Sequence, residues 1–185
     1  MRRFVDRGAI TAAWVGLGMA VTVVVSFVLV IPIEFLVGPS ALLGGMLIGY
    51  YANARSERFG GPWRRIVANA LFAGLVTGLT YAVLLLAVKA IFFNADNGYR
   101  DASANGPLIC RTGADCVYKR YLAFGRRPAF EAAGITDVAT FTSFYWGEQL
   151  STSGLMIVLS LGGSLAGGLM YGAANRRRPE EPEPA

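Results

Sequence analysis

Four long apolar segments constrain this chain more than any other feature. They cover residues 9–31, 39–51, 66–93 and 154–174. None of them contains an acidic residue, and Lys89 is the only basic residue within them. A helix needs about 20 mostly apolar residues to cross the roughly 30 Å of hydrocarbon. The sequence therefore predicts an all-helical integral membrane protein built as a bundle of four transmembrane helices.

The remaining residues fit around these segments as short connections and one long loop. We predict a single membrane domain over residues 1–175 and a disordered cytoplasmic tail over 176–185. Within the domain the expected spans are about 9–31, 39–55, 66–93 and 150–174, with an outer loop at 94–149. Only 16% of the residues are charged, where a soluble domain of this length has about 25%.

The basic residues predict how the spans are oriented. Of the 17 basic residues 15 are arginine, and the net charge is +5. Arginines flank the ends of the apolar segments in three groups: Arg2, Arg3 and Arg7; Arg55, Arg58, Arg64 and Arg65; Arg176, Arg177 and Arg178. Basic residues near span ends mark the cytoplasmic side. We therefore expect a multi-pass protein of the cell (inner or plasma) membrane with both termini cytoplasmic; the arginine-rich usage also suggests a bacterial source.

Small residues recur at four-residue spacing in every span, which places them on one helix face. Such faces let helix backbones approach closely, and this packing drives helix association in lipid. The glycines expected to pack helices are Gly16, Gly45, Gly49, Gly74, Gly78, Gly163, Gly167, Gly168 and Gly172. The alternative is that these glycines line a transport path or a hinge.

The two halves of the chain resemble each other. Residues 2–5 (Arg-Arg-Phe-Val) match residues 64–67 (Arg-Arg-Ile-Val), and the glycine-rich residues 44–49 match 167–172. The similarity predicts two parallel-repeat hairpins, an arrangement found in some transporters. Chance similarity between apolar segments is the alternative.

The outer loop contains both cysteines, Cys110 and Cys116. Two cysteines this close on the oxidising side of a membrane predict a structural disulfide. The alternative is a redox dithiol, as in the four-helix relatives of vitamin K epoxide reductase. Those enzymes carry a Cys-x-x-Cys pair, which this chain lacks.

Short helices are expected in the rest of this loop, near residues 117–124 and 128–134, with a third after Thr136 and Asp137. They form a small cap on the outer leaflet. The alternative is that the cap docks a partner or an anionic headgroup through its basic residues, which are Lys119, Arg120, Arg126 and Arg127. Lys89 near the outer end of its span is expected to pair with Glu34, or else to reach headgroup phosphates while Glu34 is solvated.

Few residues of this chain are of the types that carry catalysis or bind metals. The chain has no histidine, which removes the commonest general base and metal ligand. The loop carboxylates are spread out, so we expect no catalytic residue, metal or cofactor. The sequence favours a non-enzymatic accessory subunit, assembly factor or scaffold that presents its outer loop. The alternatives are a small-solute transporter or channel component acting as an oligomer and, third, a thiol-redox enzyme. Expected partners are the lipid bilayer and other membrane subunits or a second copy, but no nucleic acid.

Overall fold

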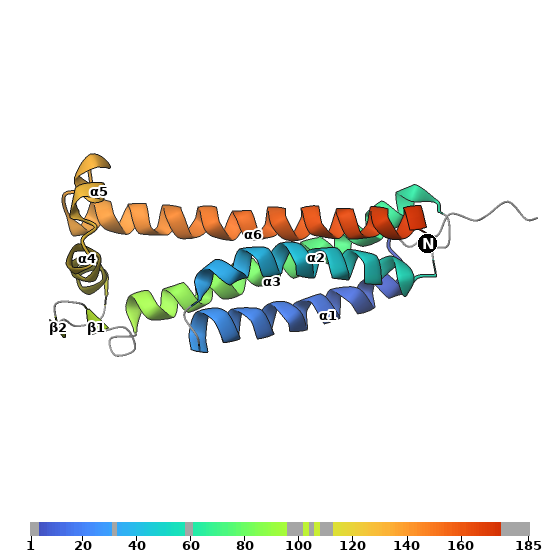
Figure 1. Cartoon of the computed structure of the whole chain (residues 1–185), viewed down its shortest axis with the longest axis horizontal. Helices are drawn as coiled ribbons and strands as arrows, with labels where there is room; N and C mark the ends of the chain where they lie inside the picture. Colours follow the sequence, from blue (N-terminus) through green and yellow to red (C-terminus); the bar gives the residue numbers. More distant parts are fainter. Residues whose placement is uncertain are drawn as a thin grey trace, which may run out of the picture. The chain divides into compact units, whose positions relative to one another are not determined.

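The computed structural model describes residues 4–30, 33–57, 61–95 and 113–174, and the backbone of two short strands. The helices are α1 (Arg7–Val24), the π-helix η1 (Val25–Val30), the 3-10 helix η2 (Glu34–Leu36), α2 (Val37–Ala54), α3 (Trp63–Asn94), α4 (Ala114–Ala123), α5 (Arg127–Ala132) and α6 (Val138–Ala174) (Figure 1). The strands β1 (Ala102–Ser103) and β2 (Gly106–Pro107) pair in antiparallel register, with Ala102 opposite Pro107. The described residues are thus helical apart from this ladder and the short connections between helices.

Among the described residues, four helical segments are long and apolar enough to cross a membrane, in agreement with the four predicted apolar helices, and this suggests membrane residence. They are Arg7–Val30, Glu34–Ala54, Trp63–Asn94 and Val138–Ala174. Large apolar side chains also lie exposed on them, including Trp14, Leu47 and Val158. Such exposure is unfavourable in water but costs nothing against lipid chains, which are as apolar as leucine.

The chain forms two compact units. The bundle unit comprises Met1–Leu84 and Ser153–Ala185, and the cap unit comprises Leu85–Thr152. The division falls within α3 and α6, so each of these helices contributes residues to both units.

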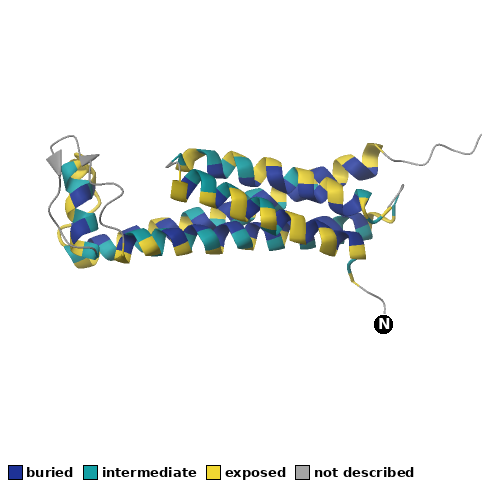
Figure 2. Ribbon diagram, turned by 90° about the horizontal axis from the view of Figure 1, so that it is seen from below, coloured by how far each residue is buried: buried dark blue, intermediate teal, exposed yellow. Residues whose placement is uncertain are grey.

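Within the bundle unit, contacts at small residues define the direction of each helix. Gly45 and Gly49 of α2 lie against Ser160 and Ser164 of α6 in the same order, so these two helices run parallel. Gly74 of α3 contacts Ser164 of α6, and Gly78, one turn later in α3, contacts Ser160, one turn earlier in α6. The helices α3 and α6 are therefore antiparallel. Buried positions recur beside exposed ones along α1, α2, α3 and α6, so each of these four helices has an inner and an outer face (Figure 2).

The last helix differs from the sequence prediction. We expected a separate short helix after Asp137 and a fourth span from about residue 150, but α6 runs unbroken from Val138 to Ala174. Its start is fixed by reciprocal bonds: the Thr140 backbone N–H donates to Asp137 Oδ1 at 2.8 Å, and the Asp137 N–H donates to Thr140 Oγ1 at 3.2 Å. Gly147 and Gly154 do not end the helix, because an isolated glycine costs only about 1 kcal/mol relative to alanine.

The cap unit has its own aromatic core. Its buried residues are Phe93, Phe130, Ile135, Phe141 and Tyr145. The predicted short helices near 117–124 and 128–134 correspond to α4 and α5, and Tyr118 and Tyr121 of α4 face this core. Their rings lie 5.1 and 5.3 Å from that of Phe141. Aromatic pairs at such separations add to the stabilisation from burial alone.

Candidate functional site

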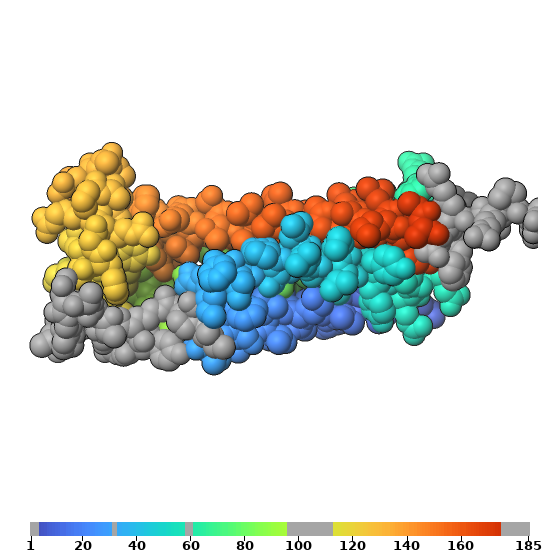
Figure 3. Space-filling model, in the orientation of Figure 1, coloured from blue at the N-terminus to red at the C-terminus, as the bar shows by residue number. Residues whose placement is uncertain are grey.

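Four of the predicted packing glycines lie where α2 meets α6. A Cβ atom at Gly45 or Gly49 would overlap the backbone carbonyl of Ser160 or Ser164, respectively. From the other side, a Cβ atom at Gly163 or Gly167 would overlap the carbonyl oxygen of Leu42 or Met46. The two helices are therefore in backbone contact along this seam, and Figure 3 shows their surfaces touching.

The remaining predicted glycines lie at the contacts of α3 with α6 and α1. A Cβ atom at Gly74, Gly78, Gly168 or Gly172 would meet the facing helix at 2.5 to 3.0 Å. One at Gly16 would overlap the hydroxyl of Thr77. Two hydroxyl groups on α6 bond across the seam with α3: Ser160 Oγ donates to the Gly74 carbonyl at 3.1 Å, and Ser164 Oγ donates to the Ala70 carbonyl at 2.7 Å.

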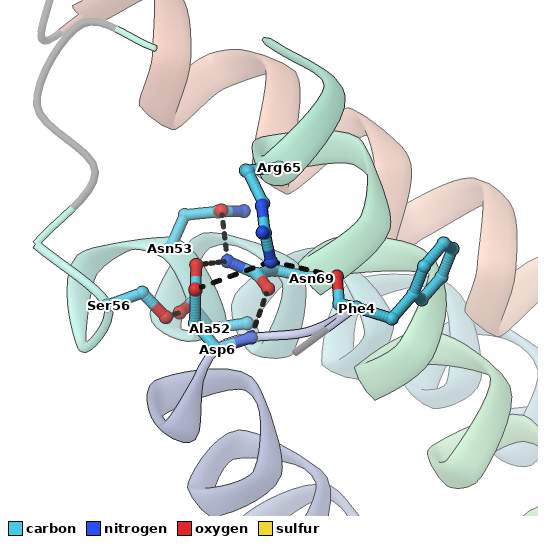
Figure 4. A network of polar contacts seen from close by, with 7 residues as sticks. All are labelled: Phe4, Asp6, Ala52, Asn53, Ser56, Arg65 and Asn69. Atoms are coloured by element: carbon cyan, nitrogen blue, oxygen red, sulfur yellow. Dashed lines mark hydrogen bonds and ion pairs between the residues drawn. The ribbon is translucent and has the colours of Figure 1, made fainter. Parts of the chain in front are cut away.

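A buried polar network joins α1, α2 and α3 at one end of the bundle unit (Figure 4). Asn53 and Asn69 are fully buried. The Asn69 amide nitrogen donates to the Asp6 carboxylate at 2.8 Å and to the Asn53 side-chain oxygen at 3.3 Å. The Asn69 oxygen accepts a 3.0 Å bond from the Asp6 backbone N–H. The nitrogen and the oxygen of the Asn69 amide thus both form hydrogen bonds within the chain.

Arg65 and Asn53 extend the network to the backbone. The Arg65 guanidinium donates to the Phe4 carbonyl at 3.2 Å and lies 3.9 Å from the Asp6 carboxylate. Asn53 Nδ2 donates to the carbonyls of Gly49 at 3.0 Å and Ile66 at 3.2 Å. These bonds fix the N-terminal segment and the adjoining ends of α2 and α3, so the network orients helices.

Sequence reasoning missed this network. A signal was present, since Asn69 interrupts an apolar run and lies four residues after Arg65, on the same helix face. A polar side chain within an apolar span commonly hydrogen-bonds to a neighbouring helix, so its position in the sequence indicates a helix contact. The partners Asp6 and Asn53 come from other segments, however, and only the fold brings them together.

A small pocket in the cap unit combines cationic and aromatic side chains. Its volume is about 140 Å³, and Lys89 of α3 and Arg120 of α4 line it together with rings that include Phe93, Tyr121 and Tyr145. Among the described residues that line it, two are cations and none is a carboxylate. Arg120 is only 9% exposed, so its side chain is largely buried in the cap unit. A cationic, partly apolar cavity of this kind suits an anionic group that also carries apolar surface.

The other basic residues of the cap that the structure describes lie outside this pocket. Lys119 forms an exposed ion pair with Asp115 at 2.6 Å. Arg126 and Arg127 are exposed at the start of α5 and line two further cavities, in which Glu148 and Glu131 also take part. Of the four basic residues considered from the sequence, only Arg120 faces the pocket beside Lys89.

Two predicted residue pairs stay predictions. Cys116 lies on α4 and is 2% exposed, whereas Cys110 lies outside the described residues. Glu34 begins η2 in the bundle unit, and Lys89 belongs to the cap unit. Residues 176–185, predicted to form a disordered tail, also lie outside the described residues.

No protein-family model, curated protein or solved structure matches this chain. In the part of the chain that the structure describes, no three or more His, Cys, Asp or Glu residues gather as they would around a metal ion. The cap pocket, with its two cations, is therefore the candidate functional site.

Proposed function

We propose that this protein is a non-enzymatic membrane subunit, an accessory or scaffold protein, whose cap unit docks an anionic group of a partner membrane protein. The observation that carries this proposal is the pocket in which Arg120 and Lys89 lie among aromatic rings. A guanidinium is planar and matches carboxylate and phosphate geometry with two parallel hydrogen bonds. The partner would insert a carboxylate, flanked by apolar side chains, into this pocket.

The core beneath the pocket supports the proposal. A connection that only joins two spans needs no core of its own, yet Phe130 and Phe141 are 4% and 0% exposed in the cap unit. Their rings lie 5.5 Å apart. This packing holds α4 and α5 in fixed positions, and a preformed surface loses less side-chain freedom on binding.

Orientation and the disulfide belong to the same proposal. The arginine pattern puts both termini in the cytoplasm and the cap on the extracytoplasmic side. A Cys110–Cys116 disulfide is expected to form there and to fix the segment that enters α4. Protein alkylated without reductant should show no mass increase, and an increase of two alkyl groups would contradict the disulfide.

Helix direction favours a second candidate, a small-solute transporter component that acts as an oligomer. Asp6, just before α1, contacts Asn69 of α3, and Gly16 of α1 contacts Thr77 of α3. These contacts follow the same order along both helices, so α1 and α3 are parallel, as α2 and α6 are. Two hairpins that run in the same sense are the arrangement of parallel-repeat transporters. The backbone contact between α2 and α6 favours a bundle that acts as a rigid anchor over one whose helices move during transport.

Co-purification in a mild detergent separates these functions. If the cap docks a partner, a stoichiometric partner should co-purify with the wild type and with the matched control Lys119→Gln. It should not co-purify with Arg120→Gln or with Lys89→Gln. Near-ultraviolet circular dichroism checks that each variant keeps its aromatic core. A homo-oligomer that releases a small solute from liposomes, with no partner bound, would contradict docking and support transport.

A further inference from the structure

An apolar groove lies on the bundle unit, and the described residues that line it all belong to that unit. It has a volume of about 740 Å³ and follows one face of α3. Val67, Leu71 and Leu75 line its length, and Phe4 and Leu161 contribute from the N-terminal segment and from α6. Trp63 and Arg64 line it at the start of α3. We propose that this groove binds an anionic phospholipid, with the phosphate at Arg64 and the acyl chains along α3.

The length of the groove matches one leaflet. From Arg64 to Leu75, a helix rises about 17 Å, at about 1.5 Å per residue. Half of a bilayer's hydrocarbon is about 15 Å thick. An acyl chain anchored at Arg64 would therefore cover the groove from the membrane surface to the bilayer centre.

The cationic end is available to a ligand. Arg64 is exposed and makes no hydrogen bond or ion pair with the described residues, whereas its neighbour Arg65 is engaged by Phe4 and Asp6. Trp63, at 41% exposure, lies beside it, and tryptophan favours the level of the headgroups. A phosphate at this position would meet a guanidinium and an indole N–H together.

The charge at one end of the groove favours a lipid over a helix of a second copy. The apolar lining residues suit acyl chains and an apolar helix face equally well. Arg64 distinguishes the two, because its guanidinium would pair with a lipid phosphate but has no partner on an apolar helix face.

Native mass spectrometry of the full chain in detergent tests the proposal. Phosphatidylglycerol and phosphatidylcholine with identical acyl chains are titrated against the wild type and two variants, Arg64→Gln and its control Arg7→Gln, which removes an exposed arginine outside the groove. We expect phosphatidylglycerol to bind about tenfold more tightly than phosphatidylcholine, because both carry the phosphate but the choline cation offsets its charge and is repelled by Arg64. This preference should disappear in Arg64→Gln and persist in Arg7→Gln. Inorganic phosphate should not compete at equal concentration, because it lacks acyl chains.

A second pair of variants tests the acyl-chain portion. Leu71→Trp fills the groove and should lower the affinity for both lipids, whereas Leu47→Trp, on an exposed face of α2, should not. Equal affinity for the two lipids in the wild type, or equal losses in Arg7→Gln and Arg64→Gln, would overturn the proposal. Efficient disulfide-linked dimers of Leu71→Cys, with no bound lipid, would assign the groove to a second copy and also overturn it.

Discussion

Within α3, one amide side chain bonds to two other segments of the chain. Asn69 contacts Asp6, just before α1, and Asn53, near the end of α2. A polar group buried in an apolar span is costly unless its hydrogen bonds are made, and here the partners come from neighbouring helices. The network therefore determines which helix ends meet. Apolar contacts alone have little directional preference and would not determine this.

Removal of this amide should destabilise the bundle unit. Asn69→Ala leaves the Asp6 carboxylate and the Asn53 oxygen without this donor, so we expect a loss of about 1–3 kcal/mol in the free energy of unfolding. The control Asn94→Ala removes an exposed amide that bonds only to the carbonyl of Ala90 at 2.8 Å, and it should change stability by less than about 0.5 kcal/mol. Reversible unfolding in mixed micelles measures both, and equal losses would show that the network adds nothing.

At the start of α6, a single carboxylate should make helix protection depend on pH. The backbone N–H and the hydroxyl of Thr140 both donate to Asp137 and lower the pKa of this carboxyl group below the ordinary 3.8. Since the folded pKa is the lower one, the charged group stabilises the helix start above about pH 4, and this contribution disappears as the pH falls through the folded pKa.

Hydrogen exchange at the Thr140 amide measures this effect. Its protection factor should fall as the pH drops below about 4 in the wild type, and it should be low at every pH in Asp137→Ala. Asp137→Asn keeps a capping oxygen but cannot titrate, so its protection should stay constant with pH. A wild-type profile as flat as that of the asparagine variant would contradict the assignment.

At the scale of whole helices, α6 offers a comparison between two glycines in one element. A Cβ atom at Gly167 would overlap the carbonyl oxygen of Met46, whereas nothing lies within 4 Å of one at Gly162. We expect Gly167→Ala to lower stability by about 1–3 kcal/mol because α2 and α6 must separate. Gly162→Ala should be neutral or stabilising by up to about 1 kcal/mol, since alanine favours a helix. Thermal unfolding in detergent compares them, and equal melting temperatures would mean that α2 and α6 are not in backbone contact.

The spans could be predicted from the sequence because lipid imposes a simple rule of length and apolarity. The extent of α6 could not, because residues 138–150 contain polar side chains that only the cap's aromatic core and the Asp137 cap explain. The packing glycines could be identified by their spacing, but not which helix each one meets. The pocket at Arg120 and Lys89 joins α3 and α4 through tertiary contacts that no local pattern encodes.

For the molecule as a whole, the orientation in the membrane decides which unit meets which compartment. Glu57, between α2 and α3, and Thr136, before α6, are both exposed. Among the described residues, α3 is the only membrane-length helix between them. The arginine pattern predicts Glu57 on the cytoplasmic side and Thr136 on the opposite side.

Cysteine substitution at these two positions tests the orientation with a membrane-impermeant maleimide. In right-side-out vesicles Thr136→Cys should be labelled and Glu57→Cys should not, and inverted vesicles should give the opposite result. The unsubstituted chain is the control; its labelling should stay low because Cys116 is buried and, on our proposal, oxidised. Exchange of the two patterns would reverse the orientation but keep the spans. Labelling of both positions from the same side would mean that α3 does not cross the membrane, since a helix between two accessible loops must separate them if it spans.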